Sequence, residues 1–170
     1  MIRYLLAMPR EAEMFKRFAC MVPDGSIEVI GIGAPDMGEF SKDDIIVNIG
    51  YAGGYKVSVG TLVEPKDAIA VDMVSERAPR FYGIGTVNRL FPLPHYTCFS
   101  SDTFVEKPAV ECAAIYDMEL FKIAKTPHKR LYAIKIVSDN LCESDCEDFN
   151  DEDAWKKAAS LIADHLKNGG

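Results

Sequence analysis

The segment Ile45-Ile46-Val47-Asn48-Ile49-Gly50-Tyr51-Ala52-Gly53-Gly54 joins a run of β-forming residues to a stretch rich in glycine. Four of its first five residues are apolar and β-branched, which is typical of a buried strand. The three glycines that follow predict a tight turn at the carboxyl end of this strand, where the backbone comes close to a ligand. Open α/β sheets bind their ligands at this end. The pattern alone fits a ligand-binding turn and a simple tight connection equally well.

The length and charge of the chain narrow the class of protein. A chain of 170 residues can bury a full core, so we expect one domain spanning residues 1–170. The net charge of −7 argues against a nucleic-acid partner, because phosphate binding requires a basic face. No apolar run approaches the roughly 18 residues that span a bilayer, so we expect no membrane partner. The first strand runs directly into Pro9-Arg10-Glu11 and does not resemble a signal peptide.

The five cysteines are odd in number and irregularly spaced, which favours reduced thiols and a cytoplasmic location. Cys142 and Cys146 lie in an acidic stretch, but no second pair and no histidine lies near them in the sequence. The spacing therefore predicts no metal site, and no cofactor is expected.

Hydrophobic patterning predicts more strands than helices. The predicted strands are Ile2–Met8, Ile27–Ile32, Ile45–Ile49, Thr61–Val63 with Ala68–Val74, Thr97–Ser100 and Leu131–Val137, and the predicted helices are Glu11–Cys20, Ala109–Lys125 and Asp151–Lys167. The region Glu76–Tyr96 contains several prolines and glycines and predicts a long loop. We therefore expect an α/β fold, a three-layer sandwich with a mixed, mostly parallel central sheet.

Carboxylates occur where predicted strands and helices meet loops. Glu11 follows the first strand, Asp117 and Glu119 lie two residues apart in a predicted helix, and Asp139 ends a core strand. Side chains two apart on a helix point about 200° from each other, so one of the pair should face inward, where a carboxylate needs a partner or a function. Structural roles remain open: Glu11 complements a helix dipole, and Asp139 is a common turn or capping residue.

Six segments together resemble one family in their order along the chain. They are Met8-Pro9-Arg10-Glu11, Gly31-Ile32-Gly33, Asn48 to Gly54, Ser100 to Val105, Asp117-Met118-Glu119 and Val137-Ser138-Asp139-Asn140. This set is similar to the purine nucleoside phosphorylase and uridine phosphorylase superfamily, and within it to the methylthioadenosine/S-adenosylhomocysteine nucleosidases. The resemblance implies a nucleoside phosphorylase-like fold, a purine nucleoside as substrate, and a homodimer or larger homo-oligomer.

The resemblance also implies roles for individual residues. Asp139 would protonate the departing purine, and Glu11 would activate a water near the anomeric carbon. Glu119 would bind the ribose hydroxyls and stabilise an oxocarbenium-like transition state. The remaining implied substrate contacts are Phe104 stacking on the base, Val105 reading its edge through the backbone, Met118 packing on the sugar, and Ala52, Gly53 and Ser138.

Several positions depart from the family pattern. Tyr51 stands where the family usually has a small Ser, Thr or Cys that holds phosphate or water, and its bulk could fill that space. The basic residue expected after Gly33 in phosphorylases is not evident, and Asp117 replaces a Glu. The chain also lacks the sequence pattern of a hairpin after the first helix and of a helix after Gly33. The absence of that basic residue favours hydrolysis of methylthioadenosine- or adenosylhomocysteine-like nucleosides over a phosphate-dependent phosphorylase, which is one alternative. The carboxylates at 11, 119 and 139 favour an enzyme, whereas Tyr51 and the missing segments favour the other alternative, a catalytically silent nucleoside-binding relative.

Overall fold

The computed structural model describes residues 1–73, 78–141 and 149–169. Strands predominate, as the sequence predicts. In chain order the elements are β1 (Ile2–Leu6), α1 (Pro9–Lys16), the short 3₁₀ helix η1 (Ala19–Met21), β2 (Ser26–Val29), β3 (Ile45–Tyr55), β4 (Leu62–Asp72), β5 (Arg80–Thr86), β6 (His95–Ser100), β7 (Ala114–Asp117), α2 (Leu120–Ala124), β8 (Arg130–Asp139) and α3 (Asp151–Gly169).

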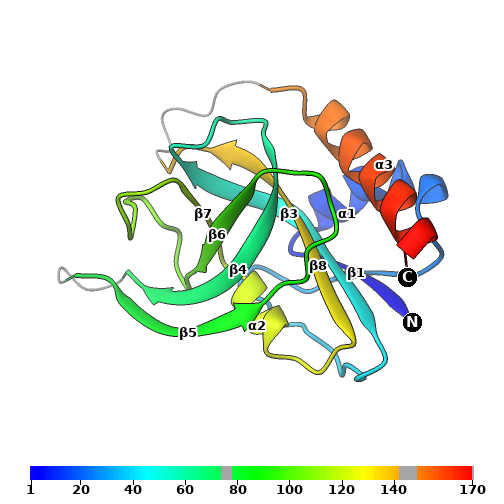
Figure 1. Ribbon diagram of the computed structural model, residues 1–170, viewed down its shortest axis with the longest axis horizontal. Helices are drawn as coiled ribbons and strands as arrows, with labels where there is room; N and C mark the ends of the chain where they lie inside the picture. Colours follow the sequence, from blue (N-terminus) through cyan, green and yellow to red (C-terminus); the bar gives the residue numbers. More distant parts are fainter. Residues whose placement is uncertain (74–77, 142–148, 170) are drawn as a thin grey trace.

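The eight strands of the described residues belong to one mixed sheet, and five of them close into a ring. The closed ring runs β3–β7–β6–β4–β8 and returns to β3, because β8 pairs with β3 in parallel and with β4 in antiparallel fashion (Figure 1). Strands β1 and β2 extend the sheet from β3, and β5 extends it from β4. The expected mixed α/β fold is confirmed, whereas the three-layer sandwich is not. Register shifts in β3 and β4 accompany this closure, as expected of bulges that bend long strands.

The predicted glycine turn at Gly50–Gly54 is wrong. Strand β3 continues through this stretch to Tyr55, pairing with β8 along most of its length and with β7 at its end. None of these glycines has a positive φ, so glycine is not required here for a turn. Glycine is required because neighbouring groups lie where a Cβ would stand, for example the Asp139 carboxylate beside Gly53.

The predicted helix Ala109–Lys125 is also wrong in its first half. Residues 114–117 form β7, a buried strand that lies between β6 and β3 in the sheet, and only Leu120–Ala124 is helical. Tertiary pairing overrides helical patterning there. The predicted loop Glu76–Tyr96 likewise contains β5, which pairs antiparallel with β4, and the first residues of β6.

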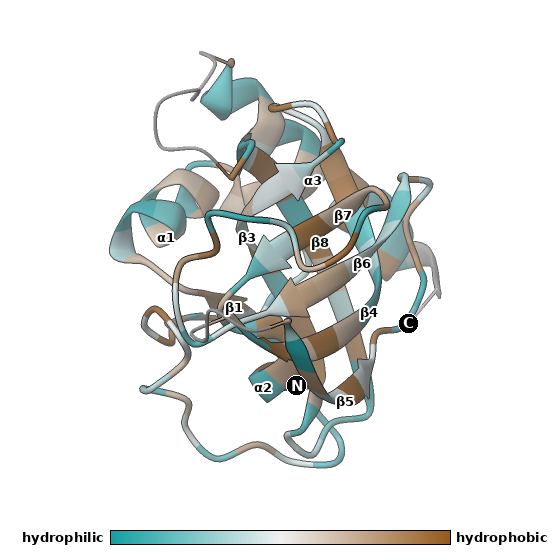
Figure 2. Ribbon diagram, turned by 90° about the vertical axis from the view of Figure 1, so that its left-hand side faces the viewer, coloured by the Kyte–Doolittle hydropathy of each residue, from teal (hydrophilic) through white to brown (hydrophobic). Residues whose placement is uncertain are grey.

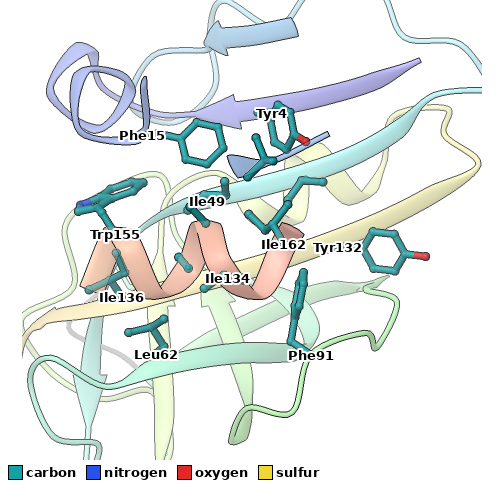
Figure 3. Packing of buried hydrophobic residues seen from close by; sticks show 14 of the residues in the cluster. Tyr4, Phe15, Ile49, Leu62, Phe91, Tyr132, Ile134, Ile136, Trp155 and Ile162 are labelled. Carbon is teal, nitrogen blue, oxygen red and sulfur yellow. The ribbon is translucent and has the colours of Figure 1, made fainter. Parts of the chain in front are cut away.

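Two apolar clusters form most of the core. Helices α1 and α3 lie side by side against the outer face of the sheet, where Trp155 and Ile162 of α3 point toward Ile49, Ile134 and Ile136 (Figure 3). A second cluster fills the interior of the ring, and α2 contributes to it. Hydropathy follows this arrangement, since apolar residues concentrate in the middle of the strands (Figure 2). Helix α3 begins as the sequence predicts, with Asn150 capping it by accepting the N–H of Asp153 at 3.1 Å.

Candidate active site

A cavity of about 710 Å³ opens at the carboxyl ends of β1, β7 and β8 and along the second half of β3. Its lining residues are Ala7, Met8, Arg10, Glu11, Ile32, Tyr51, Ala52, Gly53, Phe104, Tyr116, Asp117, Met118, Glu119, Ser138, Asp139, Phe149 and Asp151. Eight of the nine predicted site residues are among them, and the structure therefore brings these residues together. The exception is Val105, which is buried beside an adjacent hollow of about 30 Å³.

Glu11 lies on α1 and is 1% exposed. Its Oε2 accepts the backbone N–H groups of Ala7 at 2.8 Å and Met8 at 2.9 Å, and its Oε1 accepts that of Tyr51 at 2.9 Å. Burial raises the pKa of Glu11, while these three N–H groups and Lys135 oppose the rise. The carboxylate is fixed in position by backbone, as a reacting group requires.

Glu119 immediately precedes α2 and is 6% exposed. Its Oε1 accepts the backbone N–H of Gly33 at 3.0 Å, which ties the Gly31–Gly33 loop to the cavity. Lys122 lies on α2, and its Nζ donates to the carbonyl of Gly33 at 2.8 Å. Burial raises the pKa of Glu119, as do its neighbours Asp117 and Glu11, whereas Lys135 lowers it.

Asp117 and Lys135 form a buried ion pair beneath the cavity. The Lys135 Nζ lies 2.8 Å from Asp117 Oδ2, and Lys135 is 1% exposed inside the ring. Burial would lower the pKa of Lys135, but the carboxylates of Asp117 and Glu119 outweigh burial and raise it. Sequence reasoning missed this residue, although a lone lysine within the apolar run Ile134 to Val137 was a visible signal.

Asp139 ends β8 and is partly buried. Its Oδ2 accepts the hydroxyl of Ser138 at 2.9 Å, and its Oδ1 accepts the backbone N–H of Leu141 at 3.0 Å. A Cβ on Gly53 would lie 2.8 Å from Oδ1, so glycine at this position makes room for the carboxylate. The side chain is thus held at the edge of the cavity.

Tyr51 directs its hydroxyl toward α3. The phenol donates to the Asp151 carboxylate at 2.7 Å, accepts the indole N–H of Trp155 at 3.0 Å, and packs edge-on against that indole. Burial and the bond to Asp151 raise the pKa of Tyr51 to about 12, so the hydroxyl remains a donor at neutral pH. Tyr51 lines the cavity, and its ring packs between β3 and α3.

Exposed apolar side chains also line the cavity. Ile32 is 57% exposed and Phe104 is 53% exposed, although both are large and apolar. Phe149 and Met118 also contribute to the lining. Apolar walls together with a few fixed polar groups are typical of a pocket for a small organic ligand.

The described residues also bear on metal binding and membrane association. In residues 1–73, 78–141 and 149–169, no group of three or more His, Cys, Asp or Glu side chains is arranged to hold a metal ion. Cys142 and Cys146 lie outside the described residues. No helix in the described part of the chain is long and apolar enough to cross a membrane.

Comparison with known proteins yields structural likeness without sequence matches. No family model matches the chain, and no curated protein sequence matches it. A nucleosidase (MTAN) of Chlamydia trachomatis has a TM-score of 0.64 at 16% identity, over 98% of this chain and 93% of that one. The 5′-methylthioadenosine/S-adenosyl homocysteine nucleosidase of Helicobacter pylori has a TM-score of 0.61 at 16% identity, over 98% and 96%.

The likeness extends to phosphorylases. Isoform 2 of uridine phosphorylase from Schistosoma mansoni has a TM-score of 0.63 at 12% identity, over 98% of this chain and 88% of that one. A substituted form of the Chlamydia trachomatis nucleosidase was solved with MTA bound. The resemblance inferred from the six segments is confirmed at the level of the fold. The chain has the fold of the nucleoside phosphorylase and nucleosidase superfamily.

Proposed function

We propose that the protein hydrolyses the N-glycosidic bond of purine nucleosides of the methylthioadenosine/S-adenosylhomocysteine type. The observation that carries the proposal is the convergence of Glu11, Glu119 and Asp139 on one cavity with apolar walls. These carboxylates come from α1, the start of α2 and the end of β8, which are far apart in the sequence. The nucleosidase structures with the same fold support this substrate class.

The proposed reaction breaks the bond between C1′ of the ribose and N9 of the purine. Asp139 donates a proton to the purine as electrons move onto it, so the base leaves neutral. Ser138 and the Leu141 N–H orient the Asp139 carboxyl group. Phe104 is exposed in the cavity and provides a flat apolar surface for the base.

Glu11 acts on the attacking water. Its Oε1 accepts a single N–H, from Tyr51, which leaves a lone pair for a water molecule. The water oxygen forms the new bond to C1′ and loses a proton to Glu11, so the products are the free base and the free sugar. Glu119 binds the ribose hydroxyls, and its negative charge stabilises the oxocarbenium-like transition state.

The charge of the cavity favours water over phosphate as the nucleophile. Among the described lining residues Arg10 is the only Lys or Arg, and its guanidinium lies 3.5 Å from the Asp151 carboxylate. Glu11, Asp117, Glu119 and Asp151 line the same cavity. A phosphate dianion would be repelled by these carboxylates and, among the described lining residues, would meet only a cation that is already paired.

The deciding experiment measures free adenine released from methylthioadenosine, with and without phosphate. We expect release without phosphate, and a loss of ~10²–10⁴-fold in kcat/KM for Asp139→Asn and for Glu11→Gln. Glu13→Gln is the matched control, since Glu13 lies on the same helix and is exposed. Strict phosphate dependence would instead support a phosphorylase. No release from any purine nucleoside would support a silent relative.

We further propose that the protein forms a homo-oligomer through β5. This strand pairs with β4 alone among the described strands, and its Phe81, Tyr82 and Ile84 are exposed. An open strand edge with exposed apolar side chains favours association with another chain. Light scattering after size exclusion should give a mass of at least twice the 18.8 kDa chain. Ile84→Lys should lower that mass.

A further inference from the structure

Lys135 has an uncommon environment for a lysine. It lies in the middle of β8 between Ile134 and Ile136, and it pairs across the sheet with Gly50 of β3 and Val63 of β4. Its side chain is 1% exposed and its Nζ lies 2.8 Å from Asp117 Oδ2. A buried ammonium is costly unless charged partners compensate it, so this lysine needs a reason to be there.

The ion pair holds the beginning of α2. Asp117 Oδ2 also accepts the backbone N–H of Leu120 at 3.0 Å, and Asp117 Oδ1 accepts the hydroxyl of Ser100 at 2.5 Å. Ser100 Oγ in turn accepts the backbone N–H of Phe121 at 3.0 Å. Glu119 lies between Asp117 and Leu120, so the network fixes the backbone that carries it.

Lys135 is also surrounded by groups that titrate. Asp117 from β7 is in contact with it, and Glu11 from α1, Glu119 at the start of α2 and Cys98 from β6 interact with its charge. Three of these groups are carboxylates, and Lys135 is the cation that lies among them. Gly50 carries no side chain next to Lys135, and a Cβ there would lie 2.8 Å from Glu11 Oε1.

We propose that Lys135 is a positioning residue of the site: its ammonium anchors Asp117 next to the backbone that carries Glu119, and it places a positive charge near Glu11 and Glu119. The catalytic consequence rests on the proposed nucleosidase function, whereas the effect on the two glutamates is a property of the folded chain alone. An anionic Glu119 stabilises a developing ribosyl cation, and an anionic Glu11 accepts a proton from water. A neutral form of either residue does neither.

The sign of the effect follows from the charges. Burial already raises the pKa of Glu11 and of Glu119, and Lys135 opposes the rise in both. Removing the cation therefore raises both pKa values further, and the glutamates take up protons at higher pH. A purely structural lysine would change stability without moving these titrations.

The test uses Lys135→Gln, which keeps a polar side chain near Asp117 and removes the charge, and Lys135→Arg, which keeps the charge. Lys157→Gln on the exposed face of α3 is the matched control. Carbon-13 NMR of protein labelled at the glutamate carboxyl carbons follows the titrations, with Glu11→Gln and Glu119→Gln assigning the two signals. We expect the midpoints of Glu11 and Glu119 to move to higher pH in Lys135→Gln and to stay near the wild-type values in Lys135→Arg and Lys157→Gln.

A second readout is the pH profile of adenine release. At a pH below the midpoint, the ionised fraction of a carboxyl group falls about tenfold for each pH unit by which that midpoint rises. Lys135→Gln should therefore lose kcat/KM at acidic pH and recover as pH rises, whereas Lys135→Arg should keep the wild-type profile.

Two further outcomes keep the test decisive. If Lys135→Gln does not fold, the double variant Lys135→Gln/Asp117→Asn removes both charges of the pair. The titration midpoint of Glu11 is then measured in that variant, where the same move to higher pH is expected. Unchanged midpoints in a folded variant overturn the proposal. Shifted midpoints in a protein that cleaves no nucleoside support the role of Lys135 and reject the proposed function instead.

Discussion

The two faces of β3 and β8 differ in chemistry, although the same strands supply both. On the outer face Val47, Ile49, Ile134 and Ile136 pack against α1 and α3 in an apolar cluster. On the inner face Ile46, Leu131, Ala133 and Val137 belong to the second apolar cluster, and Asn48, Gly50 and Lys135 lie on the same face. Because successive side chains of a strand point to opposite faces, one sequence run builds a core and a site together.

The difference shows how stability and function are separated in this fold. The outer face buries large apolar side chains, so substitutions there should change stability. The inner face also buries apolar side chains, but it carries in addition buried charges that are compensated by one another and by backbone N–H groups. Substitutions there should change the chemistry of the cavity, and variants on each face test this division.

The largest effect is expected on the outer face, at Trp155. The indole is fully buried in the outer cluster and donates to Tyr51. Trp155→Ala should lower the free energy of unfolding by about 3–5 kcal/mol, through the cavity that it leaves. Urea denaturation measures this free energy. The control is Lys157→Ala at an exposed position of α3, which should lie within about 0.5 kcal/mol of wild type. A cost no larger than the control's would show that the outer face does not dominate stability.

Gly50→Ala tests the inner face without altering a charge. The new Cβ would lie 2.8 Å from Glu11 Oε1, so the carboxylate must move. A displacement of this kind should lower kcat/KM by about 10²-fold, because a reacting group tolerates little misplacement. Gly83→Ala on β5 is the matched control, since its Cβ meets Phe121 at an ordinary 3.5 Å. Wild-type kinetics in Gly50→Ala would mean that the position of Glu11 is not critical.

Tyr51→Phe tests the junction of the two faces. The substitution removes the bond to the Asp151 carboxylate and leaves the Trp155 N–H without its acceptor. We expect a loss of about 1.5–3 kcal/mol in stability, the range for a hydrogen bond to a charged group. Tyr82→Phe removes an exposed hydroxyl bonded to Asp72 and should change stability far less. Equal losses in the two variants would contradict a structural role for the Tyr51 hydroxyl.

The smallest effect is a pH dependence of stability at Glu119. Its pKa is raised in the folded protein, first by burial, so its ionisation costs more when folded than when unfolded. The contribution of Glu119 to the free energy of unfolding is therefore fully present below its pKa in the unfolded chain, about 4.3. It is lost as pH rises through the pKa in the folded protein. The stability of wild type minus that of Glu119→Gln should fall with rising pH, by at most about 1.4 kcal/mol per pH unit.

Urea denaturation from about pH 4 to about pH 8, the range in which a raised carboxyl pKa falls, measures this difference. Glu13→Gln is the matched control for the substitution itself, since Glu13 is exposed on α1. A wild-type advantage that grows with pH would reverse the assignment and place Glu119 in an environment that favours its charge.

Prediction from sequence succeeded where local pattern decides structure. Strand β8 and helix α3 lie where the patterns of apolar residues place them. It failed at Gly50–Gly54 and at residues 114–117, because strand pairing with distant segments decides both. The site shows the same limit. The resemblance named the three carboxylates Glu11, Glu119 and Asp139. The burial of Lys135 and the orientation of the Tyr51 side chain depend instead on neighbours that are distant in the sequence.

The sequence by itself determined the buried apolar strands within β3 and β8, the amphipathic α3, and the order of motifs that identifies the fold. Those features depend on local periodicity and on residue identity. Only the tertiary structure decided that the sheet closes into a ring, that the glycines give room to carboxylates rather than form a turn, and that Lys135 meets Asp117. Each of these depends on contacts between strands distant in the chain, which local pattern does not encode.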